Sequence, residues 1–126
     1  MRKLSVDPNR IWSWYPSKRF DKNMPWENIP PVPVFEIPPK HKASDHDFIL
    51  IDGSHRRLRA ISMKSELFVA CYEFGEEIDA ERDGLAPFRH SKDPRLYEKL
   101  LGAYLIGDEL QELVESNKRK KPFKHQ

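Results

Sequence analysis

The sequence predicts a small α+β protein built on one mixed sheet. Two short runs of apolar, β-branched and aromatic residues, 48–51 and 67–74, have the length and composition of strands. Between them, Leu58 and Ile61 are spaced for one face of a helix, and residues 96–114 repeat that spacing over a longer stretch. Strands and helices in this arrangement indicate a sheet with helices packed against it.

A chain of 126 residues is expected to form one domain. Hydrophobic residues make up only 38% of the chain and charged residues 33%, so we expect a small core and long surface segments. The domain is assigned to residues 1–116. A basic tail, 117–126, follows it and is expected to be disordered.

Cysteine content and hydropathy indicate in which cellular compartment the protein is expected. The single cysteine, Cys71, excludes an intramolecular disulfide framework and a cysteine-based zinc site. Because Cys71 lies among apolar residues, a buried strand position is favoured over a reactive thiol. No apolar run approaches the roughly 18 residues of a membrane span, and the first residues lack the apolar segment of a signal peptide. We therefore expect a cytoplasmic protein with no membrane partner.

The first third of the chain is rich in proline and aromatic residues. Residues 1–31 show weak periodicity, which predicts an extended arm that packs aromatic side chains. Trp12, Trp14 and Trp26 are assigned to covering the core, and stacking on a nucleotide is the alternative for one of them. Residues 31–37 alternate apolar positions, but their prolines restrict them to an edge or short strand.

Three further segments complete the predicted fold. The loop 38–47 contains two histidines and two aspartates, but such residues are usually solvated, so no metal ligand is assigned. The acidic segment 75–84 is expected to be a solvated loop. Asp93 is expected to cap a helix that begins at Pro94. Gly107 either separates two C-terminal helices or lies in a bend of one, and the apolar face of 96–114 either covers the sheet or pairs with another chain.

The stretch DFILIDGSHRRLRAI, residues 47–61, places polar side chains where a predicted strand turns into a helix. A helix N-terminus presents unpaired N–H groups and a partial positive charge, and both attract anions. Gly53 permits a sharp turn and a close approach, and Ser54 can cap the helix. His55 and Arg56 can donate hydrogen bonds to phosphate oxygens.

The alternative is that the arginines at 56, 57 and 59 merely face solvent. Positive charges are unfavourable in the first turn of a helix, however, and a bound anion would offset that cost. A phosphate site at the turn is therefore the hypothesis.

The same stretch, continued by LFVACYE, resembles the core motif of the ParB/sulfiredoxin superfamily. In that motif a strand, a turn with glycine, histidine and arginine, a helix and a returning strand follow one another. IPPVPVFEI is similar to the strand that precedes the motif, so the resemblance covers about residues 29–74. More weakly, YPSKRFD at 15–21 resembles an early region of ParB domains.

The resemblance implies the ParB/sulfiredoxin-like fold and a site that binds the phosphates of ATP, ADP or CTP through Gly53, Ser54, His55 and Arg56. Sulfiredoxins have their catalytic cysteine where this chain has Ser54, so sulfiredoxin activity is not expected. About 50 residues follow Glu73 without a clear helix-turn-helix, which argues against chromosome partitioning.

We therefore expect a nucleotide-binding domain in which phosphotransferase or nucleotide-hydrolysing activity is to be tested. Phosphoryl transfer needs an anion cradle, usually Mg²⁺, and a base. Glu36, at the end of the neighbouring strand, is the candidate base. Asp52 either holds the turn or binds a metal. These two residues are the candidate catalytic pair.

A non-enzymatic nucleic-acid-binding or regulatory module is the alternative function. The tail holds five positive charges, and removing them from the formal net charge of +2 leaves −3 for the rest. The body is therefore not a basic nucleic-acid surface, and any such affinity would come from Lys118, Arg119, Lys120 and Lys121. The sequence leaves the oligomeric state open.

Overall fold

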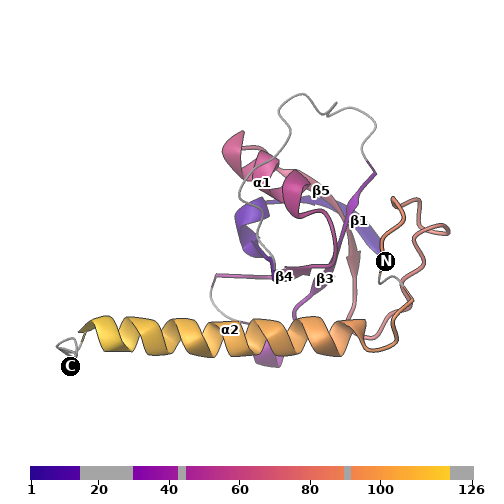
Figure 1. Cartoon of the computed structure of the whole chain (residues 1–126). Helices are drawn as coiled ribbons and strands as arrows, with labels where there is room; N and C mark the ends of the chain where they lie inside the picture. The colour runs from indigo at the N-terminus through magenta and orange to yellow at the C-terminus, as the bar shows by residue number, and fades with distance from the viewer. Residues whose placement is uncertain (15–29, 43–44, 90–91, 120–126) are drawn as a thin grey trace.

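A five-stranded mixed sheet organises the chain, with the strands in the order β1-β5-β3-β4-β2 (Figure 1). The computed structural model describes residues 1–14, 30–42, 45–89 and 92–119, with side chains as far as residue 107. The strands are β1 Arg2–Val6, β2 Ile11–Trp12, β3 Val32–Glu36, β4 Phe48–Leu50 and β5 Leu67–Tyr72. The helices are α1 Ser54–Ser62 and α2 Leu96–Arg119, and two 3-10 helices are η1 Pro8–Arg10 and η2 Pro39–His41.

The predicted α+β class is confirmed, as are its principal elements. The runs at 48–51 and 67–74 form β4 and β5, and the helix between them is α1. Cys71 is buried within β5, where burial raises the pKa of its thiol, as expected of a core residue and not of a reactive one.

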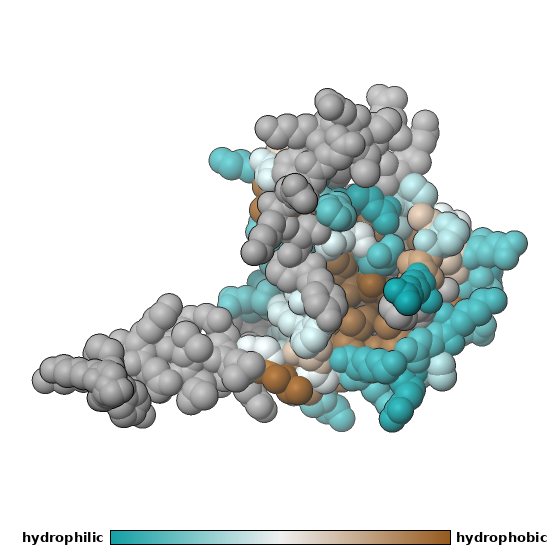
Figure 2. Space-filling model, viewed as in Figure 1, coloured by the Kyte–Doolittle hydropathy of each residue, from teal (hydrophilic) through white to brown (hydrophobic). Residues whose placement is uncertain are grey.

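Both faces of the sheet are buried because side chains alternate along each strand. On β3, Val32 and Val34 pack with Ala60 of α1, whereas Phe35 packs on the opposite face with residues of α2. The α2 face is covered by the buried side chains Ile78, Ala80, Leu85, Leu96, Leu101 and Tyr104. Figure 2 shows apolar side chains gathered over the sheet and polar ones around them.

The prediction that 31–37 forms an edge or short strand is wrong about the edge. β3 lies in the centre of the sheet, parallel to β5 and antiparallel to β4. The carbonyl of Pro33 accepts a hydrogen bond of 2.9 Å from the Ile51 N–H, one residue beyond β4. The nitrogen of Pro33, which carries no hydrogen, also faces β4, but it lies at the end of the β3–β4 pair, before the first paired residues Val34 and Leu50. The proline therefore removes no hydrogen bond from within the β3–β4 pair.

The N-terminal residues form strands that the sequence did not predict. β1 pairs antiparallel with β5, from Arg2 opposite Cys71 to Val6 opposite Leu67. β2 pairs parallel with β4 at the other edge of the sheet. Five steps of chain, at most about 18 Å, join Val6 to Ile11, whereas a flat sheet would separate its edge strands by roughly 19 Å. The short connection through η1 therefore joins the two edges of the sheet.

The C-terminal segment is one helix where the predicted fold class had helices in the plural. It begins at Leu96, two residues after the predicted start at Pro94, and Asp93 precedes it with its Oδ1 accepting from the Arg95 N–H at 2.9 Å. Gly107 lies within the continuous α2, and a Cβ there would be 3.4 Å from the Trp12 ring. The Trp12 ring also meets Tyr104 edge-on at 5.4 Å. The described part of the apolar face thus covers the sheet.

Other N-terminal predictions have mixed outcomes. Trp12 is half-buried and covers the core as expected, whereas Trp14 is 45% exposed and lies 6.1 Å from the Trp12 ring. Trp26 lies outside the described residues.

No helix in the described ranges is long and apolar enough to cross a membrane.

Candidate functional site

The turn between β4 and α1 is built on Gly53. Its φ of +102° and ψ of +35° are in the left-handed region, and it occupies the cap position of α1. A Cβ on Gly53 would lie 3.0 Å from Cγ1 of Val32 and 3.2 Å from Nη2 of Arg56. Both the conformation and the lack of space therefore require glycine at this position.

Ser54 is the first residue of α1, so the prediction that it caps the helix is wrong. The first hydrogen bond within α1 runs from the Arg57 N–H to the Gly53 carbonyl at 3.0 Å. The N–H groups at 54–56 precede it and have no acceptor within the helix. They give the start of α1 the donor groups and partial positive charge that an anion site needs.

A hollow of about 400 Å³ lies at this turn. It is lined by Asp52, Gly53, Ser54, His55 and Arg56, with Pro30 and Ala86 completing the wall. The four predicted phosphate-binding residues are thus brought together around one cavity, and Asp52 joins them. His55 and Asp52 are exposed, whereas Ser54 and Arg56 are half-buried.

Arg56 contributes a positive charge to the hollow. Its Nη1 donates a hydrogen bond of 2.7 Å to the Pro30 carbonyl, which fixes the side chain beside the turn. Burial lowers the pKa of Arg56, and the negative charge of Asp52 acts in the opposite direction. Within the described ranges Arg56 makes no ion pair. An anion in the hollow would therefore meet a guanidinium that forms no ion pair with a carboxylate of the described residues.

The neighbouring arginines do not simply face solvent. Arg57 is half-buried and its Nε donates a hydrogen bond of 2.8 Å to the Ile11 carbonyl, which ties α1 to β2. Arg59 is 9% exposed. Neither arginine lines the hollow.

Glu36 does not reach this site. β3 runs antiparallel to β4, so Glu36 pairs with Phe48 at the start of β4, whereas Gly53 follows its end. Four residues of strand, roughly 13 Å, separate Glu36 from Val32, which touches the turn. Glu36 instead forms an ion pair of 3.1 Å with Arg2. The structure therefore gives no support to Glu36 as a base acting at the hollow.

Asp47, one of the loop residues considered as metal ligands, has other partners. Asp47 pairs with Arg10 at 2.9 Å and with Lys42 at 2.8 Å, and these hydrogen bonds lower its pKa to about 2. Among the described residues, no group of three or more His, Cys, Asp or Glu side chains is arranged to hold a metal ion.

The predicted basic tail lies only partly within the described residues. Residues 117–119 belong to the last turn of α2, which includes Lys118 and Arg119. Lys120 and Lys121 lie outside the described residues. Figure 1 shows that α2 extends well beyond the sheet, so its C-terminal end lies far from the β4–α1 turn.

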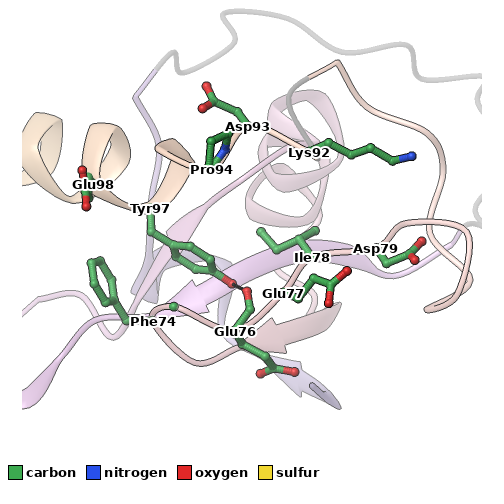
Figure 3. A pocket seen from close by; sticks show the side chains of 11 residues that line it. Phe74, Glu76, Glu77, Ile78, Asp79, Lys92, Asp93, Pro94, Tyr97 and Glu98 are labelled. Atoms are coloured by element: carbon green, nitrogen blue, oxygen red, sulfur yellow. Dashed lines mark hydrogen bonds between the residues drawn. The ribbon is translucent and has the colours of Figure 1, made fainter.

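A second and larger pocket was not predicted from the sequence. It lies between residues 74–79, which follow β5, and residues 92–98 at the start of α2 (Figure 3). The segment 75–84 was expected to be a solvated loop, yet Ile78, Ala80 and Leu85 at and beside it are buried. In the sequence, the only indication of this pocket is the high density of acidic residues in that segment, next to Phe74.

Comparisons of this chain with protein-family models, with curated proteins and with solved structures gave no match.

Proposed function

We propose that the hollow at the start of α1 binds the phosphates of a nucleotide and that the chain is a nucleotide-binding domain of the ParB/sulfiredoxin-like type. One observation carries the proposal: the consecutive residues 52–56 line one cavity at a helix N-terminus. The order of β4, a left-handed glycine turn, α1 and β5 also agrees with the motif to which the sequence is similar.

Each group has a defined part in phosphate binding. Gly53 forms the left-handed turn that places the start of α1 at the hollow, and the N–H groups at 54–56 donate to phosphate oxygens there. Arg56 supplies a charge whose position is fixed by Pro30, so little side-chain entropy is lost when an anion binds. His55 is exposed at the rim and can donate from its ring. ATP, ADP and CTP are the candidate ligands.

Asp52 supports a second step, hydrolysis or transfer of a phosphoryl group. It is exposed and lines the hollow, so its carboxylate can orient a water or an acceptor hydroxyl beside a bound phosphate. One carboxylate together with phosphate oxygens is also a usual ligand set for Mg²⁺, which would neutralise phosphate charge there. Binding does not depend on this step, and Asp52→Asn separates the two: nucleotide should still bind while any turnover is lost.

A thermal-shift titration with ATP, ADP, CTP and GTP, with and without Mg²⁺, tests the proposal. Saturating nucleotide at a hundred times its Kd should stabilise the fold by about 2.7 kcal/mol, which is readily measured as a rise in Tm. His55→Ala should weaken binding with little effect on the unliganded fold, because His55 is exposed. His41→Ala, in η2 at the other end of the sheet, is the matched control. Absence of stabilisation by every nucleotide, or equal effects of the two substitutions, would overturn the proposal.

A non-enzymatic module that binds nucleic-acid phosphates is the second candidate. The observation that favours it is the position of Lys118 and Arg119 at the end of a helix that extends away from the sheet (Figure 1). Truncation before Lys118 discriminates the two. It should abolish salt-dependent RNA or DNA binding in the module and leave free-nucleotide binding unchanged in the nucleotide-binding domain.

A further inference from the structure

The pocket beside α2 has a volume of about 560 Å³. It lies at the end of the sheet opposite the β4–α1 turn, because β5 runs parallel to β3 and leads from the Val32 end towards Phe74. Figure 3 shows side chains of two segments facing one another across it, those of 74–79 and those of 92–98. The pocket is therefore separate from the proposed nucleotide site.

Aromatic rings form one wall of this pocket. Phe74 is 43% exposed, and its ring centroid lies 5.4 Å from that of Tyr97. Tyr97 packs edge-on against the buried Phe35 at 5.0 Å, and its hydroxyl donates to the Glu76 carbonyl at 2.8 Å, as drawn in Figure 3. These contacts fix an apolar surface that faces the cavity. Aromatic faces of this kind attract methylene chains and cations.

The rest of the lining is acidic. Its charged members are one lysine and five carboxylates: Lys92, Glu76, Glu77, Asp79, Asp93 and Glu98. Two of the carboxylates have partners outside the pocket lining. Glu76 pairs with the N-terminal ammonium, and Asp93 pairs with Lys99 at 2.8 Å.

The other three carboxylates of the lining differ from Glu76 and Asp93 in having no ion-pair partner among the described residues. Within the part of the chain that the structure describes, Glu77, Asp79 and Glu98 form no ion pair. Arg82 lies in the same loop: its backbone N–H donates to Asp79 Oδ1 at 3.1 Å, and its guanidinium donates to Asp83 and to the Glu77 carbonyl. Against Lys92 alone, the three carboxylates leave an excess of two negative charges on the pocket lining.

The carboxylates of the lining are not arranged around one compact ion. No group of three or more of them in the described residues is arranged to hold a metal. Figure 3 shows Glu98 on the same side of Tyr97 as Phe74, and Glu77 and Asp79 on the other side. A ligand that satisfies both sides must be extended, positive at its ends and apolar between them.

We propose that this pocket binds an alkylammonium ligand, a diamine or polyamine chain. Its methylenes lie along Phe74 and Tyr97, and its ammonium groups pair with Glu98 at one end and with Glu77 and Asp79 at the other. Lysine side chains of a peptide present the same chemistry, so the test includes both sources. The proposal does not depend on nucleotide binding at the other end of the sheet.

Calorimetric titration of the full chain with putrescine, spermidine and a lysine-containing peptide, at low ionic strength, tests the proposal. We expect saturable binding of one ligand per chain. Glu77→Gln and Glu98→Gln should each weaken it by about two- to fivefold, the usual range for one exposed ion pair. Phe74→Leu keeps an apolar side chain but removes the ring, and should weaken binding by a similar factor of about two to five.

Glu81→Gln is the matched control, since Glu81 is exposed in the same acidic loop but does not line the pocket. It should leave the affinity unchanged. Binding of the free amines assigns the site to a soluble polyamine, and binding of the peptide alone assigns it to lysine side chains. No saturable binding up to about 10 mM of any probe would overturn the proposal. Equal weakening by Glu81→Gln, or equal affinity for Mg²⁺, would overturn it too, because either result indicates nonspecific attraction to acidic surface.

Discussion

Substitution of Gly53 by alanine tests the construction of the β4–α1 turn. Two terms destabilise the variant. A residue with a side chain at a φ of +102° costs about 1–3 kcal/mol. The added Cβ would also lie 3.0 Å from Cγ1 of Val32, below the usual 3.5–4.0 Å contact, and relieving this overlap costs about 1–3 kcal/mol more.

The unfolded chain offsets part of this loss. Alanine reduces the conformational freedom of the unfolded state relative to glycine, which returns about 0.4–1 kcal/mol. The expected net destabilisation for Gly53→Ala is therefore about 1–6 kcal/mol, and the midpoints of the three ranges give about 3 kcal/mol. Urea unfolding followed by circular dichroism measures this free energy, and a thermal melt should show a fall in Tm of roughly 3–5 °C per kcal/mol for a chain of this size.

Two other glycines provide matched controls. Gly75 has a similar φ of +90°, but a Cβ there meets nothing within 4 Å, so Gly75→Ala measures backbone strain without the contact. It should destabilise by about 1–2 kcal/mol. Gly102, inside α2 with no contact within 4 Å, should give a gain of about 0.5–1 kcal/mol as alanine. If Gly53→Ala loses no more stability than Gly75→Ala, the close contact with Val32 has no energetic consequence and the reasoning is refuted.

Three further substitutions test other contacts in the sheet. Tyr72→Phe removes the 2.6 Å hydrogen bond to Asp83 and should cost about 1–2 kcal/mol in urea unfolding; an unchanged midpoint contradicts this. Arg57→Ala should cost about 1–3 kcal/mol, because the Ile11 carbonyl loses its 2.8 Å donor, and Arg57→Lys should restore only part of it. For Asp47 the folded pKa of about 2 lies below the unfolded value, so its stabilisation is complete above about pH 4 and is lost as pH falls towards 2. The stability difference between wild type and Asp47→Asn should therefore shrink over that range, and a constant difference would show that its ion pairs do not stabilise the fold.

β4, α1 and β5 could be predicted from the sequence because the composition and spacing that indicate each of them lie within the element itself. FILI and LFVACY have strand composition, and Leu58 and Ile61 have helical spacing, so β4, α1 and β5 were expected. β1 was not, because RKLSV has apolar side chains only at Leu4 and Val6 and becomes a strand through its pairing with β5. The central position of β3 depends on where Pro33 falls in the ladder, which composition does not reveal.

The same distinction applies to the two candidate sites. Residues 52–56 are consecutive, so their gathering around one hollow follows from a single turn. Glu36 was assigned to that site because β3 precedes β4 in the chain, but the antiparallel direction of the pair carries its end away from the turn. The pocket beside α2 joins segments 74–79 and 92–98, which meet only when α2 packs on the sheet, so no pattern within either segment predicts it.

Both edge strands of the sheet come from the first twelve residues, since β1 covers β5 and β2 covers β4. Removing that single segment would therefore uncover two rows of unpaired backbone N–H and C=O groups at once, on either side of an apolar sheet. Exposed edges of this kind pair with other chains. A protein shortened in this way is expected to self-associate through added strands, so the short N-terminal segment protects the fold against aggregation as well as completing it.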